Sequence, residues 1–266
     1  MWLFSRLRAA AARGFIRWLT IERLPDLLPE PWDPSALGLQ PGDVLLFEGH
    51  ARVSEIIKSF QQSTWSHAAL YIGTGTDLER LGLRPATAVA WEVPRVLEVL
   101  LGRGVVLTPL TEYARHRMRV CRARDLADPD RAQVLGYALA RLGQDYDLRQ
   151  LFDLARLILP WALLPRRWHS SLFREVSGST ARTVCSALIA EAFQAVDYPV
   201  LPIVVRDIAG SEHWHKRNPR LYTPRDFDLS PFFDVVKAVP DGRGYRALPW
   251  EPVFCNDARE CASGVR

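Results

Sequence analysis

One cysteine of the sequence lies where nucleophilic chemistry is favoured. Cys185 follows a loop rich in Ser, Gly and Thr and falls in the first turn of an amphipathic helix predicted in the segment TVCSALIAEAF. The unpaired N–H groups and the positive dipole end of a helix N-terminus favour the thiolate, which is the reactive form of cysteine. We therefore expect Cys185 to be a nucleophile, although a cysteine taken alone is more often a small buried hydrophobic residue.

His67 is the candidate base for this thiol. It lies at the start of SHAALYIG, whose small, apolar and β-forming residues predict a strand that ends on glycine. A neighbouring imidazole stabilises a thiolate as an ion pair and later passes its proton to the leaving group, while a third polar group fixes the ring. Sequence position alone leaves open whether the two residues meet.

The elements that must position these residues are short strands followed by helices. Apolar and β-branched segments predict strands at 43–47, 66–73, 95–101, 104–110 and 117–123. The third and fourth of these are expected to form a hairpin around Gly102 and Gly104. Helical spacing predicts one helix over 53–60 and another that is capped by Asp128 or Asp130 and runs to about Leu142 before Gly143.

Five segments in chain order resemble the permuted NlpC-type hydrolases of the YiiX/YaeF-like group, which are related to lecithin:retinol acyltransferase-like enzymes. The segments are QPGDVLLFEG, STWSHAALYIG, RVLEVLLGRGVVLTPLTEYA, ALARLGQDYDLRQLF and TVCSALIAEAF, and TPRDFDLSPFFDVV resembles the closing segment. The histidine precedes the cysteine, which is the order of the permuted branch. The resemblance implies an α+β, circularly permuted papain-like fold, with an antiparallel sheet of five or six strands packed on the cysteine-bearing helix.

The resemblance also implies the roles of the site residues. Cys185 takes the place of the nucleophile, His67 that of the base, and Glu98 in RVLEV that of the orienting acid. Glu92 in VAWEV competes with Glu98 for the third role. We prefer Glu98 because the segment that follows it fits the order of the family.

Substrate contacts are expected from three further residues, Tyr146, Ser66 and Ser186. Tyr146, in GQDYD, matches a tyrosine that lies near the active site in this superfamily, and its alternative role is that of a core aromatic residue. The sequence departs from the family where an aromatic residue usually precedes the cysteine and Glu follows two positions after it. Val184 and Ala187 stand there instead, which leaves the family's substrate contacts in doubt but not the thiol chemistry.

The implied reaction is attack of the thiol on an amide or ester, with a thioacyl-enzyme that is hydrolysed or transferred to an acceptor. We expect a lipid or lipid-linked substrate, because the apolar stretch 151–168 and the N-terminal segment are suited to a membrane surface. A peptidase or amidase acting on peptidoglycan-type or lipopeptide substrates is the alternative. A noncatalytic lipid-binding module is the alternative from another class. No cofactor is expected.

Composition, charge and cysteine content limit which other kinds of protein the sequence can encode. The chain has 266 residues, 48% of them hydrophobic and 24% charged, which is enough for one sizeable core. The net charge of +4 comes from scattered basic residues without interleaved aromatics, which argues against nucleic-acid binding. The four cysteines are too few for a disulfide framework, so we expect a reducing compartment. His213 and His215 lack further ligands at a suitable spacing, and no metal site is expected.

Four regions are predicted along the chain. They are an amphipathic N-terminal helix at 1–24, a Pro-rich linker at 25–41, the catalytic domain at 42–238 and a C-terminal tail at 239–266. The helix has an apolar side and several arginines, so it either lies on a membrane or packs on the domain's own surface. We expect a cytoplasmic protein that contacts the inner face of the membrane peripherally, and the sequence does not indicate the oligomeric state.

Overall fold

The computed structural model describes residues 14, 17–18, 20–21, 37–84, 91–100, 102–144, 184–208 and 210–236. Several predictions from the sequence lie outside these residues. They concern most of the N-terminal helix and of the linker, the apolar stretch 151–168, Tyr146, and the C-terminal tail with Cys255 and Cys261.

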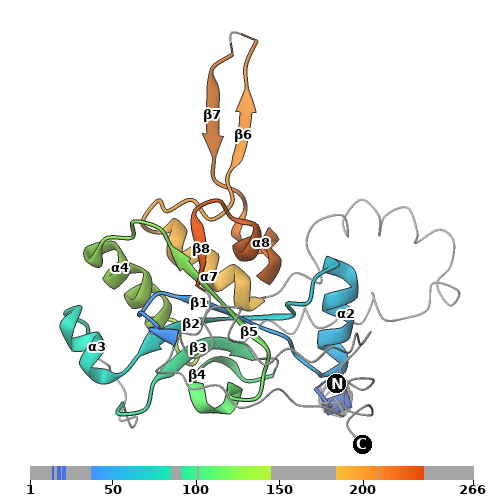
Figure 1. Cartoon of the computed structure of the whole chain (residues 1–266), viewed down its shortest axis with the longest axis vertical. Helices are drawn as coiled ribbons and strands as arrows, with labels where there is room; N and C mark the ends of the chain where they lie inside the picture. The colour runs from blue at the N-terminus through green and yellow to red at the C-terminus, as the bar shows by residue number, and fades with distance from the viewer. Residues whose placement is uncertain are drawn as a thin grey trace, which may run out of the picture.

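An antiparallel sheet lies at the centre of the fold (Figure 1). Within the described residues its six strands are, in spatial order, β4 (Gly104–Pro109), β3 (Arg95–Leu100), β2 (His67–Gly73), β1 (Val44–Phe47), β5 (Met118–Ala123) and β8 (Phe233–Val236). Every neighbouring pair is antiparallel. The strands predicted from the sequence, and the hairpin of β3 with β4, are confirmed.

Helices cover this sheet because both of its faces are apolar. On one face α7 (Val184–Gln194) packs against β2, β3 and α4 (Asp128–Leu139). The opposite face has a second cluster of buried residues that includes Phe47, Tyr71 and Val96, and it reaches the short helix η2 (Leu110–Tyr113). The remaining elements are α2 (Arg52–Gln61), α3 (Gly75–Arg80), β6 (Ile203–Arg206), β7 (Glu212–His215), η5 (Pro219–Leu221) and α8 (Pro224–Leu229). This arrangement of strands and helices is the expected α+β fold.

The helix α4 differs from its prediction at both ends. Asp128 is the first residue of the helix and does not cap it. Ala127 occupies the cap position and makes no side-chain hydrogen bond there. The helix ends at Leu139 and not near Leu142. The amides of Arg141 and Leu142 bond to carbonyls three residues earlier, which tightens the chain after the helix.

A buried ion pair holds β1 against β5. Asp43, which is 1% exposed, accepts hydrogen bonds from Arg122 through both carboxylate oxygens, at 2.8 Å from Nε and 2.7 Å from Nη2. The same carboxylate accepts a bond from the backbone N–H of Gln40 at 2.8 Å. Paired bonds of this kind between guanidinium and carboxylate are strong and fix geometry, so the pair sets where β1 begins.

Trp18 is the one aromatic residue described in the N-terminal segment, and it contacts α2. The guanidinium of Arg52 lies over its ring, 4.6 Å from the centroid. This is a contact of the kind expected if the N-terminal helix packs on the domain. Among the helices described, none has the length and apolar character needed to span a bilayer.

Candidate active site

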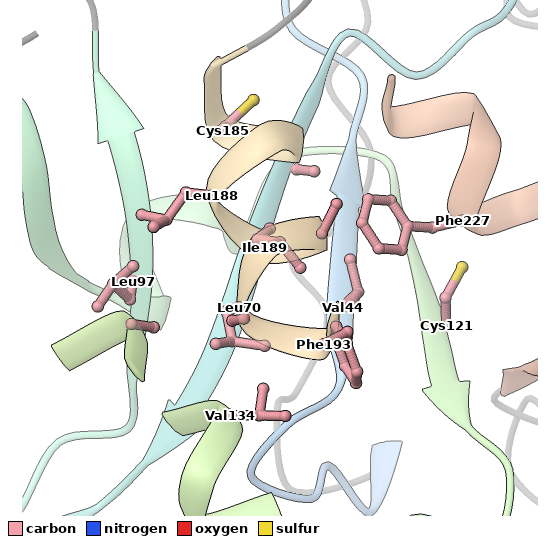
Figure 2. Close-up of a cluster of buried hydrophobic side chains, with 14 of the residues drawn as sticks. Val44, Leu70, Leu97, Cys121, Val134, Cys185, Leu188, Ile189, Phe193 and Phe227 are labelled. Carbon is pink, nitrogen blue, oxygen red and sulfur yellow. The ribbon is translucent and has the colours of Figure 1, made fainter. Parts of the chain in front are cut away.

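Cys185 is positioned by the helix that fills the core. It is the second residue of α7, whose side chains Ile189 and Phe193 are buried against the sheet, and its own exposed fraction is 3%. Figure 2 shows Cys185 at the N-terminal end of this helix, with Leu188 directed toward Leu97 of β3. The apolar face of α7 therefore fixes the thiol near the end of the central strands.

His67 begins β2, the strand next to β1, and pairs there with Phe47. Its side chain is 20% exposed. The residue before it, Ser66, is buried and accepts a hydrogen bond from the backbone N–H of Gly49 at 2.8 Å. The strand ladder on one side and this bond on the other hold the histidine backbone.

Sheet register brings Glu98 to His67. The ladder between β2 and β3 pairs Leu70 with Leu97, and its continuation places Glu98 beside Ala69, two residues from His67 and on the same face. Glu98 is 1% exposed, and its Oε2 lies 2.5 Å from Nε2 of His67. Glu92, the competing candidate, is exposed in the turn before β3.

Tyr113 is a residue of this site that sequence reasoning missed. It ends η2, and its hydroxyl donates to Oε2 of Glu98 at 2.5 Å. Its ring stacks on Phe47, with centroids 4.0 Å apart and planes inclined by 20°. The tyrosine falls within the matched segment GVVLTPLTEYA, but it comes fifteen residues after Glu98, and no local pattern reveals the contact.

Cys185 and His67 are hydrogen-bonded and shift each other's protonation. Burial alone would raise the pKa of the Cys185 thiol, but the charge of His67 and bonds from His67, the backbone of Ala68 and Ser186 lower it below its ordinary value. Burial alone would lower the pKa of His67, but the thiolate and Glu98 raise it to about 10. The favoured state is a thiolate beside an imidazolium. Because Nε2 faces Glu98, Nδ1 is the ring nitrogen left for the thiol.

The acid beside the histidine stays ionised. Burial would raise the pKa of Glu98, but hydrogen bonds from His67, Thr108 and Tyr113 and the charge of His67 lower it. Burial and the charge of Glu98 raise the pKa of Tyr113 above its ordinary value, so its hydroxyl remains a donor. The group is thus arranged as a thiolate, an imidazolium and a carboxylate in sequence.

The residues expected to contact substrate have different positions. Ser186 is fully buried beside the thiol, and the hydroxyl of Ser66 is engaged with Gly49. Tyr146 is outside the described residues. Among the described side chains, no group of three or more His, Cys, Asp or Glu residues is placed to hold a metal ion. His213 and His215 lie on the exposed strand β7.

One known protein family matches part of the chain. Residues 38–154 match the family described as permuted papain-like amidase enzyme, YaeF/YiiX, C92 family. The matched segment includes His67, Glu98 and Tyr113 and ends before Cys185. The match confirms the resemblance stated from the sequence, and it supports a cysteine hydrolase of the permuted papain-like, YaeF/YiiX type.

One solved structure similar to the chain is that of the metalloprotein yiiX from Escherichia coli O157:H7. The identity is 17%, the alignment covers 75% of this chain and 97% of that chain, and the TM-score is 0.46. No curated protein matches the chain.

Proposed function

We propose that Cys185 is the nucleophile, His67 the general base and acid, and Glu98 the group that orients the histidine. One observation carries this proposal. The thiol of Cys185 contacts the imidazole of His67, and Nε2 of that ring lies 2.5 Å from Oε2 of the buried Glu98. A nucleophile, a base and an orienting group connected in this order are the arrangement used for covalent acyl chemistry.

The reaction follows from the protonation states. The Cys185 thiolate adds to the carbonyl carbon, and the backbone N–H of Cys185, which as the second residue of α7 has no carbonyl partner inside the helix, donates to the oxyanion. His67 gives its proton to the leaving nitrogen or oxygen as that bond breaks, which produces a thioester. His67 then takes a proton from water or another acceptor, which attacks the thioester and frees the thiol.

For the substrate we propose an amide or ester of a lipid or lipid-linked molecule, reached by a protein that is peripheral to the membrane. Two features of the sequence support this: the apolar, arginine-containing N-terminal segment and the apolar stretch 151–168. The amidase description of the matching family favours an amide bond, so a peptidyl or lipopeptide amide is the second candidate.

The test is covalent labelling. Purified protein is incubated with fatty-acyl and peptidyl probes of matched thiol reactivity, and the adduct is located by mass spectrometry. We expect faster modification of Cys185 by the acyl probe. Faster modification by the peptidyl probe would overturn the lipid proposal and support the peptide amide. Turnover with and without an added amine or alcohol acceptor then distinguishes hydrolysis from acyl transfer.

Two variants serve as controls. Cys185→Ala should lose the adduct, whereas Cys121→Ala should keep it, because Cys121 is buried in β5 away from the site. A chain that binds lipid equally well with and without the thiol, and forms no adduct, would be a noncatalytic binding module.

A further inference from the structure

The connection between α2 and β2, residues 62–66, leads the chain into His67. This histidine pairs with Phe47 of β1, but it precedes the ladder that joins β2 to β3, which begins at Leu70. The strand β3 carries Glu98, the acid that the imidazole must meet. The backbone of His67 is therefore placed by β1 and by the connection before it, so whatever holds that connection also places the imidazole.

The short helix α8 bonds to both ends of this connection. Arg225 donates to the carbonyl of Gln61, the last residue of α2, at 2.9 Å. Three residues later, Asp228 accepts a hydrogen bond from Nε1 of Trp65 at 3.2 Å. One element thus holds the connection where it leaves α2 and again two residues before His67.

The helix α8 is itself firmly held, so it can act as a support. The side chain of Phe227 is fully buried and packs edge-on against Phe233, with ring centroids 5.6 Å apart. Figure 2 shows this ring directed toward β1. At the start of the helix, the backbone N–H and the hydroxyl of Thr223 donate to Oδ2 of Asp226 at 2.6 and 2.8 Å, which caps it.

A second partner fixes both Asp228 and Trp65. Nη1 of Arg119, on β5, donates to the two carboxylate oxygens of Asp228 at 2.5 and 2.7 Å, and such charge-assisted bonds are strong. The same guanidinium lies over the ring of Trp65, 5.0 Å from the centroid. Trp65 is 5% exposed and belongs to the buried cluster that contains Cys185. Packing, stacking and a hydrogen bond together fix the orientation of this indole.

We propose that Asp228 is a positioning residue of the reaction, which acts through Trp65 to fix where His67 enters β2. The imidazole is thereby held between the thiol and Glu98. A displacement of about 1 Å in a reacting group can lower a rate about 100-fold, so a support of this kind matters. The inference rests on the proposed function, because it takes His67 as the base. It adds a role for the closing segment of the domain, to which α8 belongs.

Two variants break the bond between Trp65 and Asp228 from opposite sides. Asp228→Asn keeps the size of the side chain but loses its charge, and Trp65→Phe keeps an aromatic ring but loses the indole N–H. Iodoacetamide alkylation of Cys185 is followed by mass spectrometry from pH 4 to 9. Each variant should raise the midpoint of this pH profile by about half a pH unit or more, because a displaced imidazolium stabilises the thiolate less.

The matched control is Asp234→Asn. Asp234 lies on β8 and also accepts a hydrogen bond from an arginine, Arg124, but this pair is exposed and does not contact the connection before His67. Its alkylation profile should follow that of the wild-type protein. An equal shift in Asp228→Asn and Asp234→Asn would show a general effect of lost negative charge and would overturn the proposal.

The double variant Asp228→Asn/Trp65→Phe separates positioning from independent effects on stability. Both changes break one bond, so its midpoint should shift no further than that of the more affected single variant. The midpoint does not depend on how much of the protein is folded, and thermal unfolding measures stability separately. Shifts that add in the double variant, or wild-type midpoints in both single variants, would overturn the proposal.

The variant His67→Ala distinguishes failure of this inference from failure of the proposed function. If His67→Ala raises the midpoint while Asp228→Asn and Trp65→Phe do not, the pair of Cys185 and His67 stands and the positioning role of Asp228 is wrong. If His67→Ala leaves the midpoint unchanged, the proposed function and the positioning role are both wrong.

Discussion

His67 and Tyr113 share one acceptor, since Nε2 of the histidine and the hydroxyl of the tyrosine each lie 2.5 Å from Oε2 of Glu98. The carboxylate is thus held from two sides by groups on β2 and η2. Because the phenol remains protonated, it can act only as a donor here, and it fixes both the position and the charge of the acid.

Removal of this phenol hydroxyl tests its role. Tyr113→Phe keeps the ring stack on Phe47 but takes one donor from Glu98, whose pKa should rise. Ionised Glu98 is lost as pH falls through that pKa, so the acidic limb of the rate profile should move to higher pH. A hydrogen bond to a charged group is worth about 1.5–3 kcal/mol, which predicts a fall in kcat/KM of about 10- to 100-fold.

Tyr71→Phe is the control for this change. Tyr71 is buried on the same face of the sheet, but its neighbouring charges are those of Asp77 and Asp43. Its rate profile should follow that of the wild-type protein. Identical acidic limbs in Tyr113→Phe and the wild-type protein would show that the tyrosine only packs.

The choice between the two glutamates has its own test. Glu98→Gln should lower turnover about 10- to 100-fold, because the amide keeps the shape but loses the charge that holds the imidazolium. Glu92→Gln, at an exposed position, should leave turnover unchanged. Steady-state kinetics of both variants decides between them, and a larger loss in the Glu92 variant would reverse the assignment.

The thiolate–imidazolium pair of Cys185 and His67 predicts that turnover and alkylation respond differently to high pH. The lowered pKa of Cys185 favours the thiolate, so alkylation by iodoacetamide at pH 6 should be faster than that of an ordinary exposed thiol. The raised pKa of His67 keeps the imidazolium until about pH 10. Above that pH turnover should fall, because the proton donor for the leaving group is lost, while alkylation should not fall.

The same chemistry distinguishes the two cysteines described by the structure. Burial raises the pKa of Cys121 to about 12, so it should remain unlabelled at pH 6. His67→Ala should raise the pKa of Cys185 and slow its labelling at that pH. Mass spectrometry over pH 5 to 9 measures both sites, and unchanged labelling of Cys185 in His67→Ala would refute the coupling.

The buried pair of Asp43 and Arg122 predicts a loss of stability. Arg122→Ala leaves an uncompensated buried carboxylate, and loss of one partner of a buried pair costs about 3 kcal/mol. Arg124→Ala, in the turn directly after β5, removes an exposed partner of Asp234 and should cost much less. Urea unfolding measures the free energy of unfolding of both variants, and equal losses would contradict the importance assigned to burial.

Much of the fold could be predicted because its strands have strong local patterns. The run VLLF predicted β1, and the paired runs around Gly102 and Gly104 predicted the β3–β4 hairpin. Glu98 could be named from its place in a matched segment, whereas its contact with His67 depends on sheet register. Register is set by pairing between distant segments, and a single sequence shows it only indirectly.

The missed features have a common physical cause. The role of Tyr113 comes from a long-range contact that no spacing reveals. The run IVVR of β6 has the composition of a buried strand, yet all its residues are exposed, because a sequence shows which residues are apolar but not which ones other elements cover. Asp128 was one of the two residues expected to cap α4. The helix instead begins at Asp128 itself, with Pro129 in its first turn.

The placement of the thiol on the core helix links activity to chain completion. His67 and Glu98 belong to strands made early in synthesis, whereas α7 follows more than a hundred residues after His67. The buried side chains of α7 also supply a large part of the core against β2 and β3. A nascent or truncated chain without α7 therefore lacks both Cys185 and the buried side chains that α7 adds to the core, so the proposed nucleophile reaches His67 only as this part of the core closes.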